Sequence, residues 1–355
     1  MEFNPEIERI LAIETSCDDT SAAVVTWQGQ VEAVCSANQD LVHEPFGGVV
    51  PEIASRNHTL NILPLIEQTL SRSGRNWSDI HGLAVTSRPG LVGSLLVGLV
   101  TAKTLSLAKG LPLVAVNHLE GHLLAGFLKD NDFSAPDEFG FPYLGLAISG
   151  GHTHLFQVDE LGSYTILGRT VDDAAGEAFD KFAKMAGLGF PGGVQVDWLS
   201  REGDASKYSF PRAMIHEENL NFSFSGLKTA AQNQLAKMSA EEKKSEISSL
   251  CASYQEAIVD VLLAKLTRGV QQTGIKTVVL TGGVSANSRL RSRAEEWGQQ
   301  QGCLVVIPPL RYCTDNAAMI GYAGIHRLRK GERAAEDLGP SPRPYPGDFK
   351  TADSP

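Results

Sequence analysis

Two segments of the chain share one hydrophobic pattern, although they lie far apart in the sequence. Residues 9–25, RILAIETSCDDTSAAVV, pass from apolar positions through a turn of small and acidic residues into a second β-prone run. Residues 144–156, LGLAISGGHTHLF, do the same around a Ser-Gly-Gly turn. Such a pattern is typical of a β-hairpin. We therefore expect two duplicated lobes, each of which begins with a hairpin.

Other segments have helical spacing. Residues 91–107 repeat apolar side chains at that spacing with few charges, which predicts a buried helix. Similar patterns occupy residues 172–186 and 246–267, and a strand at residues 277–280 runs through a Gly-Gly turn into a new helix near Ala286. Strand, Gly-rich turn and helix in succession predict a parallel α/β lobe with a nucleotide near the helix N-terminus.

Two stretches lack any period. Residues 129–140, KDNDFSAPDEFG, combine acids, Pro and Gly, which indicates a linker between the lobes or an exposed loop. The end of the chain, rich in Pro, Gly and acids, is expected to be flexible. We therefore expect an N-terminal lobe of residues 1–125 plus 316–335, a C-terminal lobe of residues 126–315, and a flexible tail of residues 336–355.

Composition narrows the class of protein. The chain has 355 residues, 42% of them hydrophobic, without an apolar run of membrane-spanning length or a basic, apolar leader. It is expected to be soluble and cytoplasmic. Its five scattered cysteines fit a reducing compartment and argue against zinc held by thiolates. The net charge of −10 argues against nucleic-acid binding by this chain alone, because phosphates require clustered Lys and Arg.

The segment NHLEGHLL, residues 117–124, spaces two histidines four residues apart. On a helix His118 and His122 share one face and can bind one cation. Glu120 points roughly 200° away from His118, so this H-x-E-x-H order differs from the H-E-x-x-H and H-x-x-E-H patterns of zinc peptidases. The alternative is a pair of packed imidazoles. Asp315 could be a third ligand, or only a helix-capping carboxylate.

The turns offer further candidates. Residues 149–153 could cradle a phosphate with backbone N–H groups, or form only a tight turn. Residues 14–21 carry three acids and suit a metal–nucleotide complex better. Asp180 lies on a charged helix face that is either solvated or in contact with a ribose. The turn at residues 190–193 allows a ligand close to the backbone, and Asn287 faces either water or a nucleoside.

In their order these segments resemble the TsaD family, once called Gcp, the tRNA adenosine threonylcarbamoyltransferases. The resemblance covers roughly residues 8–328. It rests on IETSCDDTSAAVV, VVPEIASRNH, NHLEGHLLA, ISGGHTHL, DDAAGEAFDKFAKMAGLGFPGG, FSFSGLKTA, TGGVSANSRLR and TDNAAMIG. It implies an α/β protein of the actin-like ATPase (ASKHA) fold, with two duplicated lobes and a cleft between them.

The resemblance also implies a set of site residues. The metal ligands would be His118, His122 and Asp315, joining the two lobes across the cleft. The residues in contact with the adenylate substrate would be Ala147, Ile148, Ser149, Gly150, Gly151, Asp180, Gly193, Asp197 and Asn287. The family often has His where this chain has Asn117, Asp where it has Asn57, and Pro where it has Val194.

The implied reaction transfers a threonylcarbamoyl group from threonylcarbamoyl-AMP to N6 of adenosine 37 in tRNAs that read codons beginning with A. No side-chain nucleophile is required, because the anhydride carries its own leaving group. One divalent ion per subunit would polarise the acyl oxygen; the resemblance suggests Fe²⁺, and Zn²⁺ suits the same ligands. ATP or ADP could occupy the same cleft.

The implied partners are tRNA, the paralogue TsaB and the ATPase TsaE, with TsaC as the source of the adenylate. A candidate basic strip for tRNA consists of Lys265, Arg268, Lys276, Arg289, Arg291 and Arg293, with solvated helix faces as the alternative reading. Competing classes are a zinc metallopeptidase, a sugar-kinase-like phosphotransferase and a binding subunit without activity.

Overall fold

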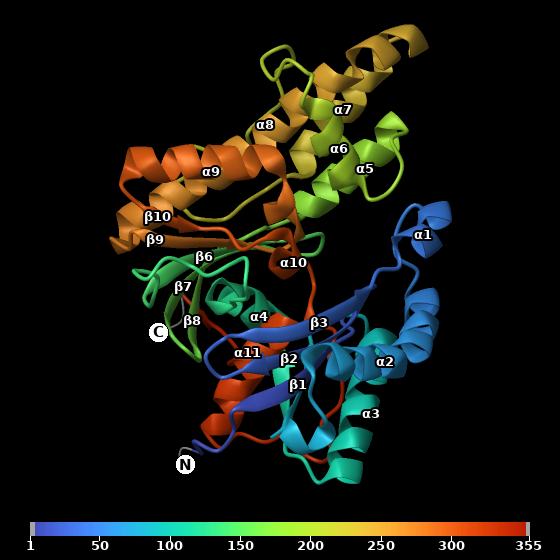
Figure 1. The fold of residues 1–355 in the computed structure, drawn as a ribbon. Helices are drawn as coiled ribbons and strands as arrows, with labels where there is room; N and C mark the ends of the chain where they lie inside the picture. The colour runs from blue at the N-terminus through green and yellow to red at the C-terminus, as the bar shows by residue number, and fades with distance from the viewer. Residues whose placement is uncertain (1–3, 353–355) are drawn as a thin grey trace. The chain divides into compact units, whose positions relative to one another are not determined.

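The computed structural model describes residues 4–352, which divide into two compact units. Unit 1 comprises Met1–Asp137 and Arg311–Asp348, and unit 2 comprises Glu138–Leu310 and Phe349–Pro355. The expected N-terminal lobe consisted of residues 1–125 and 316–335. Unit 1 also includes residues 126–137, 311–315 and 336–348, so Asp315 belongs to unit 1 and not to the C-terminal lobe. Each unit contains one sheet and its own covering helices (Figure 1).

The sheet of unit 1 has the strand order β3-β2-β1-β4-β5. Its strands are β1 (Arg9–Glu14), β2 (Thr20–Thr26), β3 (Val31–Ala37), β4 (Leu83–Arg88) and β5 (Leu113–Asn117). The first three strands are antiparallel neighbours, while β4 lies parallel to β1 and β5 parallel to β4. The hairpin expected at residues 9–25 is confirmed.

Helices cover both faces of this sheet. Helices α2 (Pro51–Ser73) and α3 (Val92–Lys109) cover one face, and α11 (Ala317–Arg329) covers the other. The other helices of unit 1 are α1 (Asp40–His43), α4 (His118–Leu124) and α10 (Leu310–Cys313, at the boundary), with 3₁₀ turns η1 (Glu44–Phe46), η2 (Trp77–Asp79) and η3 (Ala125–Phe127). Leu11 and Ile13 pack with α2 and α3, whereas the neighbouring Ala12 faces α11 at Gly321, as the period of two along a strand requires.

Unit 2 repeats the plan of unit 1. Its strand order is β10-β9-β6-β7-β8-β11, with β6 (Tyr143–Ile148), β7 (Thr153–Glu160), β8 (Ser163–Arg169), β9 (Thr277–Thr281), β10 (Leu304–Val306) and β11 (Lys350–Thr351). Strands β6, β7 and β8 are antiparallel, and β9 and β10 continue in parallel from β6. The second hairpin and the duplication of the lobes are therefore confirmed.

The helices of unit 2 enclose one continuous hydrophobic core. They are α5 (Ala175–Ala186), α6 (Gly192–Ser200), α7 (Ser225–Ala236), α8 (Ala240–Thr273) and α9 (Ser288–Gln301), with the 3₁₀ turn η4 (Gly283–Ala286). Helix α8 starts earlier than the apolar period predicted, because Ser239 and Glu242 form a capping box before its charged first turns. The apolar period of a helix does not reveal such a polar extension.

Three expectations need correction or extension. Helix α3 is not fully buried, since Val92, Leu96 and Val100 are exposed. Helix α2 was not predicted, because its apolar side chains alternate with many polar ones and because Pro64, a residue type that usually ends a helix, lies inside it. The tail expected to be flexible from residue 336 makes specific contacts within the described residues: Lys103 donates to the carbonyl oxygens of Glu336 and Leu338, and β11 joins the sheet of unit 2.

Two helices, α3 and α8, would be long and apolar enough to cross a membrane by length and composition alone. The relevant stretch of α8 is 67% buried within the fold, which is the pattern of a core helix. The corresponding stretch of α3 is 28% buried, and its exposed apolar side chains contribute to an apolar surface of unit 1.

Candidate active site

The two histidines lie on α4, directly after the carboxyl end of β5. Helix α4 begins where the Asn117 side chain accepts a hydrogen bond from the Leu119 backbone N–H at 2.9 Å. His118 and His122 then stand one turn apart, and both are buried. Their rings meet edge to face, with 4.6 Å between centroids. This placement turns the Nε2 atoms of both rings toward the same point.

Asp315 reaches that point from a distant part of the sequence. It precedes Asn316, whose side chain accepts from the Met319 backbone N–H and thereby caps α11. The capping role considered for Asp315 therefore belongs to Asn316. Asp315 Oδ1 lies 3.1 Å from His122 Nε2 and 3.3 Å from His118 Nε2. All three residues belong to unit 1. The expectation that the ligands join two lobes is therefore wrong.

The three donor atoms form a nearly equilateral triangle, because the two Nε2 atoms are themselves 3.1 Å apart. Ligand atoms bound about 2.1 Å from one ion would stand about 3.0 Å apart at right angles and about 3.4 Å apart in a tetrahedron. The observed separations fall between these values. The residues therefore fit one divalent ion and form a possible His/Asp metal site.

Glu14, at the end of β1, holds the other side of the His118 ring. Its fully buried carboxylate accepts from Thr86 Oγ1 at 2.5 Å, from the Ser16 backbone N–H, and lies 3.1 Å from His118 Nδ1. Ser16 Oγ also lies 3.1 Å from the same nitrogen. A proton on Nδ1 leaves Nε2 free as a ligand, as in carboxylate–histidine–metal arrangements.

Glu14 was recognised from sequence only as one of three acids in a turn. Its partner His118 is 104 residues away, and the signal available in advance was a carboxylate at the end of an otherwise apolar strand. Such a residue must find a partner when the strand is buried. The sequence does not say which partner it finds.

The charges of the site depend on one another. Burial opposes protonation of His118, yet the carboxylates of Asp315 and Glu14 outweigh it and raise the pKa of His118 well above its usual value. Burial lowers the pKa of His122, although Asp315 opposes that shift. Although desolvation opposes its charge, Asp315 has a pKa well below the usual range because His118 faces it. A cation at the centre would take over the role of the His118 charge.

Glu120, the residue that suggested a peptidase, points elsewhere. Its buried carboxylate accepts from Arg327 Nη2 at 2.7 Å and Nε at 2.9 Å. Arg327 also binds Glu332 at 2.8 Å. These contacts give Glu120 a structural role on α4 and leave it outside the donor triangle.

The nine residues expected at the adenylate all lie in unit 2: five at the end of β6 and in the turn after it, and the others on α5, on α6 and at the start of α9. Ala147 and Ile148 end β6 and are buried, so they support the turn that follows and present no exposed side chain to a ligand. Gly150 and Gly151 form the exposed turn that follows. A Cβ atom on Gly282, after β9, would lie 2.3 Å from the carbonyl oxygen of Ile148, so the two strand ends are close neighbours.

Helix α5 begins against the same turn. Ala175 donates its backbone N–H to Thr153 Oγ1 at 2.9 Å, and Gly176 donates to the carbonyl oxygen of Ser149 at 3.2 Å. A Cβ on Gly176 would stand only 2.7 Å from that oxygen. Glycine therefore permits the N-terminus of α5, with its partial positive charge, to approach the turn.

Asp180, on α5, stabilises the turn before α6. Its Oδ1 accepts from the backbone N–H of Gly192 at 2.9 Å and of Gly193 at 3.4 Å. A Cβ on Gly192 would lie 2.7 Å from the Asp180 Cα atom, whereas one on Gly193 would meet nothing nearer than 3.8 Å. Gly192 is therefore required by packing, and Gly193 leaves its backbone accessible.

Asp197 and Asn287 each accept hydrogen bonds from the first turn of α9. Asp197 Oδ1 accepts from the Ser288 backbone N–H at 3.0 Å and from Ser288 Oγ at 2.7 Å. Asn287 Oδ1 accepts from the Leu290 backbone N–H at 3.0 Å, while its Nδ2 donates to Gln255 at 2.5 Å. A pocket of about 420 Å³ lies beside them, lined by Ser200, Arg201, Gln255, Ser288 and Arg289 among others.

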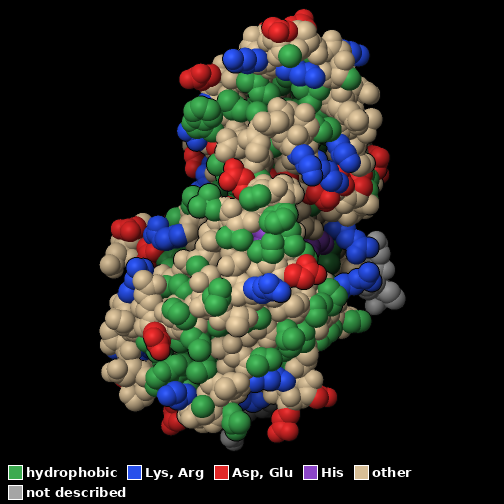
Figure 2. Space-filling model, turned by 90° about the vertical axis from the view of Figure 1, so that its right-hand side faces the viewer, with side chains coloured by type: hydrophobic (Ala, Val, Ile, Leu, Met, Phe, Trp, Pro, Cys, Tyr) green, Lys and Arg blue, Asp and Glu red, His purple; other side chains and the backbone are tan. Residues whose placement is uncertain are grey.

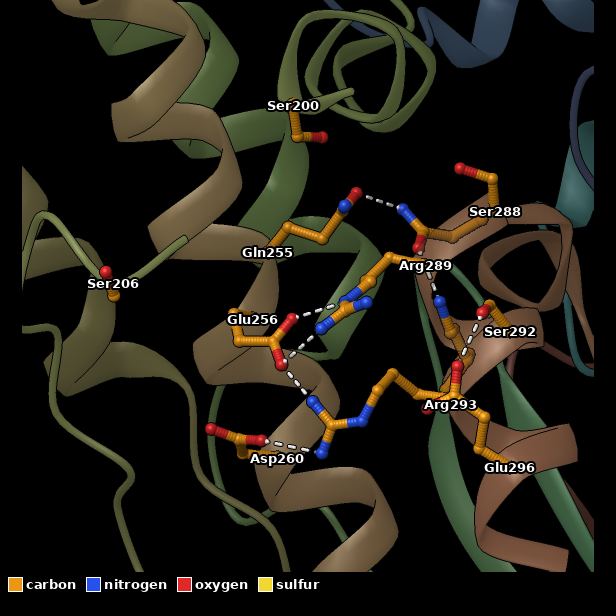
Figure 3. Close-up of polar contacts among 12 residues, drawn as sticks. Ser200, Ser206, Gln255, Glu256, Asp260, Ser288, Arg289, Ser292, Arg293 and Glu296 are labelled. Atoms are coloured by element: carbon orange, nitrogen blue, oxygen red, sulfur yellow. Dashed lines mark hydrogen bonds and ion pairs between the residues drawn. The ribbon is translucent and has the colours of Figure 1, made fainter. Parts of the chain in front are cut away.

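Most of the candidate basic strip is paired inside unit 2. Glu256 binds both Arg289 and Arg293, and Arg293 also reaches Asp260 at 3.3 Å (Figure 3). Lys265 and Arg268 donate to the backbone of residues 215–219, and Arg291 donates to the carbonyl oxygen of Pro308. These groups anchor helices and loops, so the strip is a much weaker phosphate-binding surface than the residue count suggested.

The fold matches solved structures at low sequence identity. HypF from T. kodakarensis has a TM-score of 0.59 at 12% identity, covering 95% of this chain and 50% of HypF. Component A of (R)-2-hydroxyglutaryl-CoA dehydratase from Acidaminococcus fermentans has a TM-score of 0.52 at 14% identity, covering 90% of this chain and 98% of that protein. The chain is thus an α/β protein of the actin-like ATPase (ASKHA) fold.

Sequence relatives define it further. A family model described as TsaD, tRNA N6-adenosine threonylcarbamoyltransferase, matches residues 30–322. A relative of that name from Bdellovibrio bacteriovorus is 60% identical over 97% of this chain and 100% of its own length. Another from Anaeromyxobacter dehalogenans is 51% identical over 94% of this chain and 98% of its own length. The chain belongs to the TsaD family, a family of transferases that modify tRNA.

Proposed function

We propose that this protein transfers the threonylcarbamoyl group of threonylcarbamoyl-AMP to N6 of adenosine 37, in tRNAs that read codons beginning with A. One divalent ion held by His118, His122 and Asp315 would assist the transfer. The observation that carries the proposal is the triangle of three donor atoms, at 3.1, 3.1 and 3.3 Å, within a member of the TsaD family.

The bound ion would act as a Lewis acid that polarises the acyl oxygen. The residues of unit 1 prepare its site. With the ion bound, Glu14 would accept from the protonated Nδ1 of His118, and Nε2 would give up its proton and coordinate the ion. Asp315, whose side chain is 24% exposed, supplies negative charge at the accessible side of the triangle. The two buried histidines cannot lose their orientation without unpacking α4.

The residues of unit 2 would bind the adenylate. The exposed turn Gly150–Gly151 would offer backbone N–H groups to the departing AMP phosphate, and the nearby N-terminus of α5 a partial positive charge. Asp180 and Gly193 would border the nucleoside together with Asp197 and Asn287. ATP or ADP, which share the AMP moiety, would bind in the same place. Rigid helix starts suit orientation of the reactants, which is the main requirement for an activated acyl donor.

The donor set suits both Fe²⁺ and Zn²⁺. Two imidazoles and one carboxylate with open positions are typical of non-haem iron centres, and three protein ligands plus one open position are typical of catalytic zinc. We propose Fe²⁺ as the resident ion and Zn²⁺ as an active or competing substitute. Incorporation of each metal under anaerobic conditions distinguishes them.

A protein partner is supported by an apolar surface on unit 1. Helices α2 and α3 expose Leu60, Leu63, Val92, Leu96, Val100 and Leu107. Figure 2, which faces the side on which these helices lie, shows hydrophobic side chains spread over that surface. We propose that it binds the paralogue TsaB, and that TsaE joins this assembly while TsaC supplies the adenylate, all in the cytoplasm. Partners would also carry much of the tRNA contact, given the net charge of −10.

The test is mass analysis of tRNA nucleosides after incubation with threonylcarbamoyl-AMP, with and without the partner subunits. Wild-type protein is expected to form threonylcarbamoyladenosine, and His118→Ala is expected to lose metal and transfer activity together. If His118→Ala loses its metal but transfers at the wild-type rate, the ion is structural. Phosphate transfer from ATP to a sugar, without tRNA modification, would replace the proposal by a kinase-like function.

A further inference from the structure

The C-terminal segment, residues 341–348, contacts the carboxyl ends of strands β4 and β5 in unit 1, where α4 follows β5. Strands β4 and β5 are parallel neighbours, and their last paired residues are Arg88 and Asn117. Asp348 bridges these two. Its carboxylate accepts from Arg88 Nη2 at 2.6 Å, from Arg88 Nε at 2.7 Å and from Asn117 Nδ2 at 2.9 Å.

The bridge is built as a buried polar network. The side chains of Arg88 and Asp348 are 10% and 9% exposed. Asp348 Oδ2 also accepts from the Tyr345 backbone N–H at 2.8 Å, and the Tyr345 ring covers the Arg88 guanidinium, 4.4 Å from its centroid. Ser341 donates its backbone N–H to the carbonyl oxygen of Ser87 at 2.9 Å. A bidentate, buried pair with these additional bonds holds one defined geometry.

Asn117 connects this network to the candidate metal centre. Both ends of its amide are in use, since Nδ2 donates to Asp348 and Oδ1 accepts from the Leu119 backbone N–H at the start of α4. The amide cannot rotate without breaking one of these bonds. His118 is the next residue and His122 follows one turn later, so the start of α4 decides where both imidazoles stand.

We propose that Asp348 is a positioning residue of the metal centre, acting through Asn117 on the start of α4. This inference rests on the proposed function, because it assumes that His118, His122 and Asp315 bind an ion. The tail that was expected to be flexible therefore supports the metal centre. Without the Asp348 carboxylate the ion would be bound less tightly.

The test is titration of the metal-free, full-length protein with Co²⁺, whose visible absorption spectrum reports the ligand geometry, together with a thermal unfolding curve. Asp348→Asn keeps the shape of the side chain but removes the charge and one of the two acceptor oxygens that serve Arg88, Asn117 and Tyr345. We expect Co²⁺ affinity to fall about 10-fold, with an altered spectrum, in the range of lost supporting contacts in other metal sites. Asp337→Asn removes an equal charge from an exposed position a few residues before this segment and is expected to bind Co²⁺ as wild type does.

A second variant separates positioning from folding. Asn117→Ser keeps a helix-capping oxygen and leaves the Arg88–Asp348 pair intact. It removes the amide group that connects Asp348 to the start of α4. It should weaken Co²⁺ binding as Asp348→Asn does, while the unfolding temperature changes less. This comparison decides the matter if Asp348→Asn fails to fold.

The possible failures are distinct. Wild-type protein that binds no Co²⁺ would overturn the proposed metal centre, and the positioning role with it. If wild type binds but both variants show the wild-type affinity and spectrum, the metal centre stands and Asp348 only stabilises the fold.

Discussion

Replacement of Glu14 by glutamine tests the electrostatic logic of the site with the smallest change of shape. In the native site one carboxylate oxygen accepts from the Ser16 backbone N–H, while the other faces Thr86 Oγ1 and His118 Nδ1. A glutamine that keeps its oxygen toward Ser16 turns its amide N–H₂ toward Thr86 and His118. The Thr86 hydroxyl can reverse its role, because it both donates and accepts.

His118 cannot change from donor to acceptor at Nδ1 without a change at its other ring nitrogen. To accept from the amide, its Nδ1 must lose the proton, which then moves to Nε2, the atom that faces His122 and Asp315. A metal would have to displace that proton, and the ligand would lose the supporting carboxylate. Supporting contacts of this kind are worth about 10–100-fold in metal affinity, or roughly 1.4–2.7 kcal/mol. We expect a loss in that range and a matching loss of transfer activity at limiting metal.

The measurement is metal affinity by competition with a chelator, alongside the unfolding temperature. Thr86→Val is the matched control, since it removes another hydrogen bond to Glu14 without touching His118; it should lower stability and leave metal affinity within about twofold. Wild-type metal affinity in Glu14→Gln, together with a lowered unfolding temperature, would refute the idea that Glu14 sets the protonation of His118.

Three other outcomes are expected. Glu120→Gln should lower stability by about 1–2 kcal/mol, because it weakens the buried contact to Arg327, but leave metal affinity unchanged and reveal no peptidase activity. Gly192→Ala should lower the unfolding temperature through its steric conflict, whereas Gly193→Ala should fold normally and raise the KM for threonylcarbamoyl-AMP; equal effects on both measurements would contradict the packing argument. Burial lowers the pKa of His154 from 6.5 to about 4 in the folded protein, so the unfolded chain takes up a proton at this histidine as the pH falls from about 6.5 to 4 and the folded one does not. Over that range wild type should lose on the order of 3 kcal/mol more of its unfolding free energy than His154→Gln, measured by urea unfolding.

Local patterns in the sequence were sufficient for several of the elements and for part of the site, although they missed helix α2 and the charged start of α8. The two hairpins, the strand at residues 277–280 and the shared face of His118 and His122 each depend on a period or spacing of only a few residues. The order of the motifs then led to the family and its fold. These features could be predicted because neighbouring residues alone determine them.

Contacts across the chain needed the tertiary structure. Glu14 reaches His118, Asp348 reaches Asn117, and Asp315 joins the histidines within one unit, over separations of 104, 231 and 193 residues. The basic strip shows the same limit, since Glu256 and Asp260 pair with its arginines only when α8 and α9 pack together. A sequence shows that a buried charge needs a partner, whereas the path of the chain through the fold decides which group that partner is.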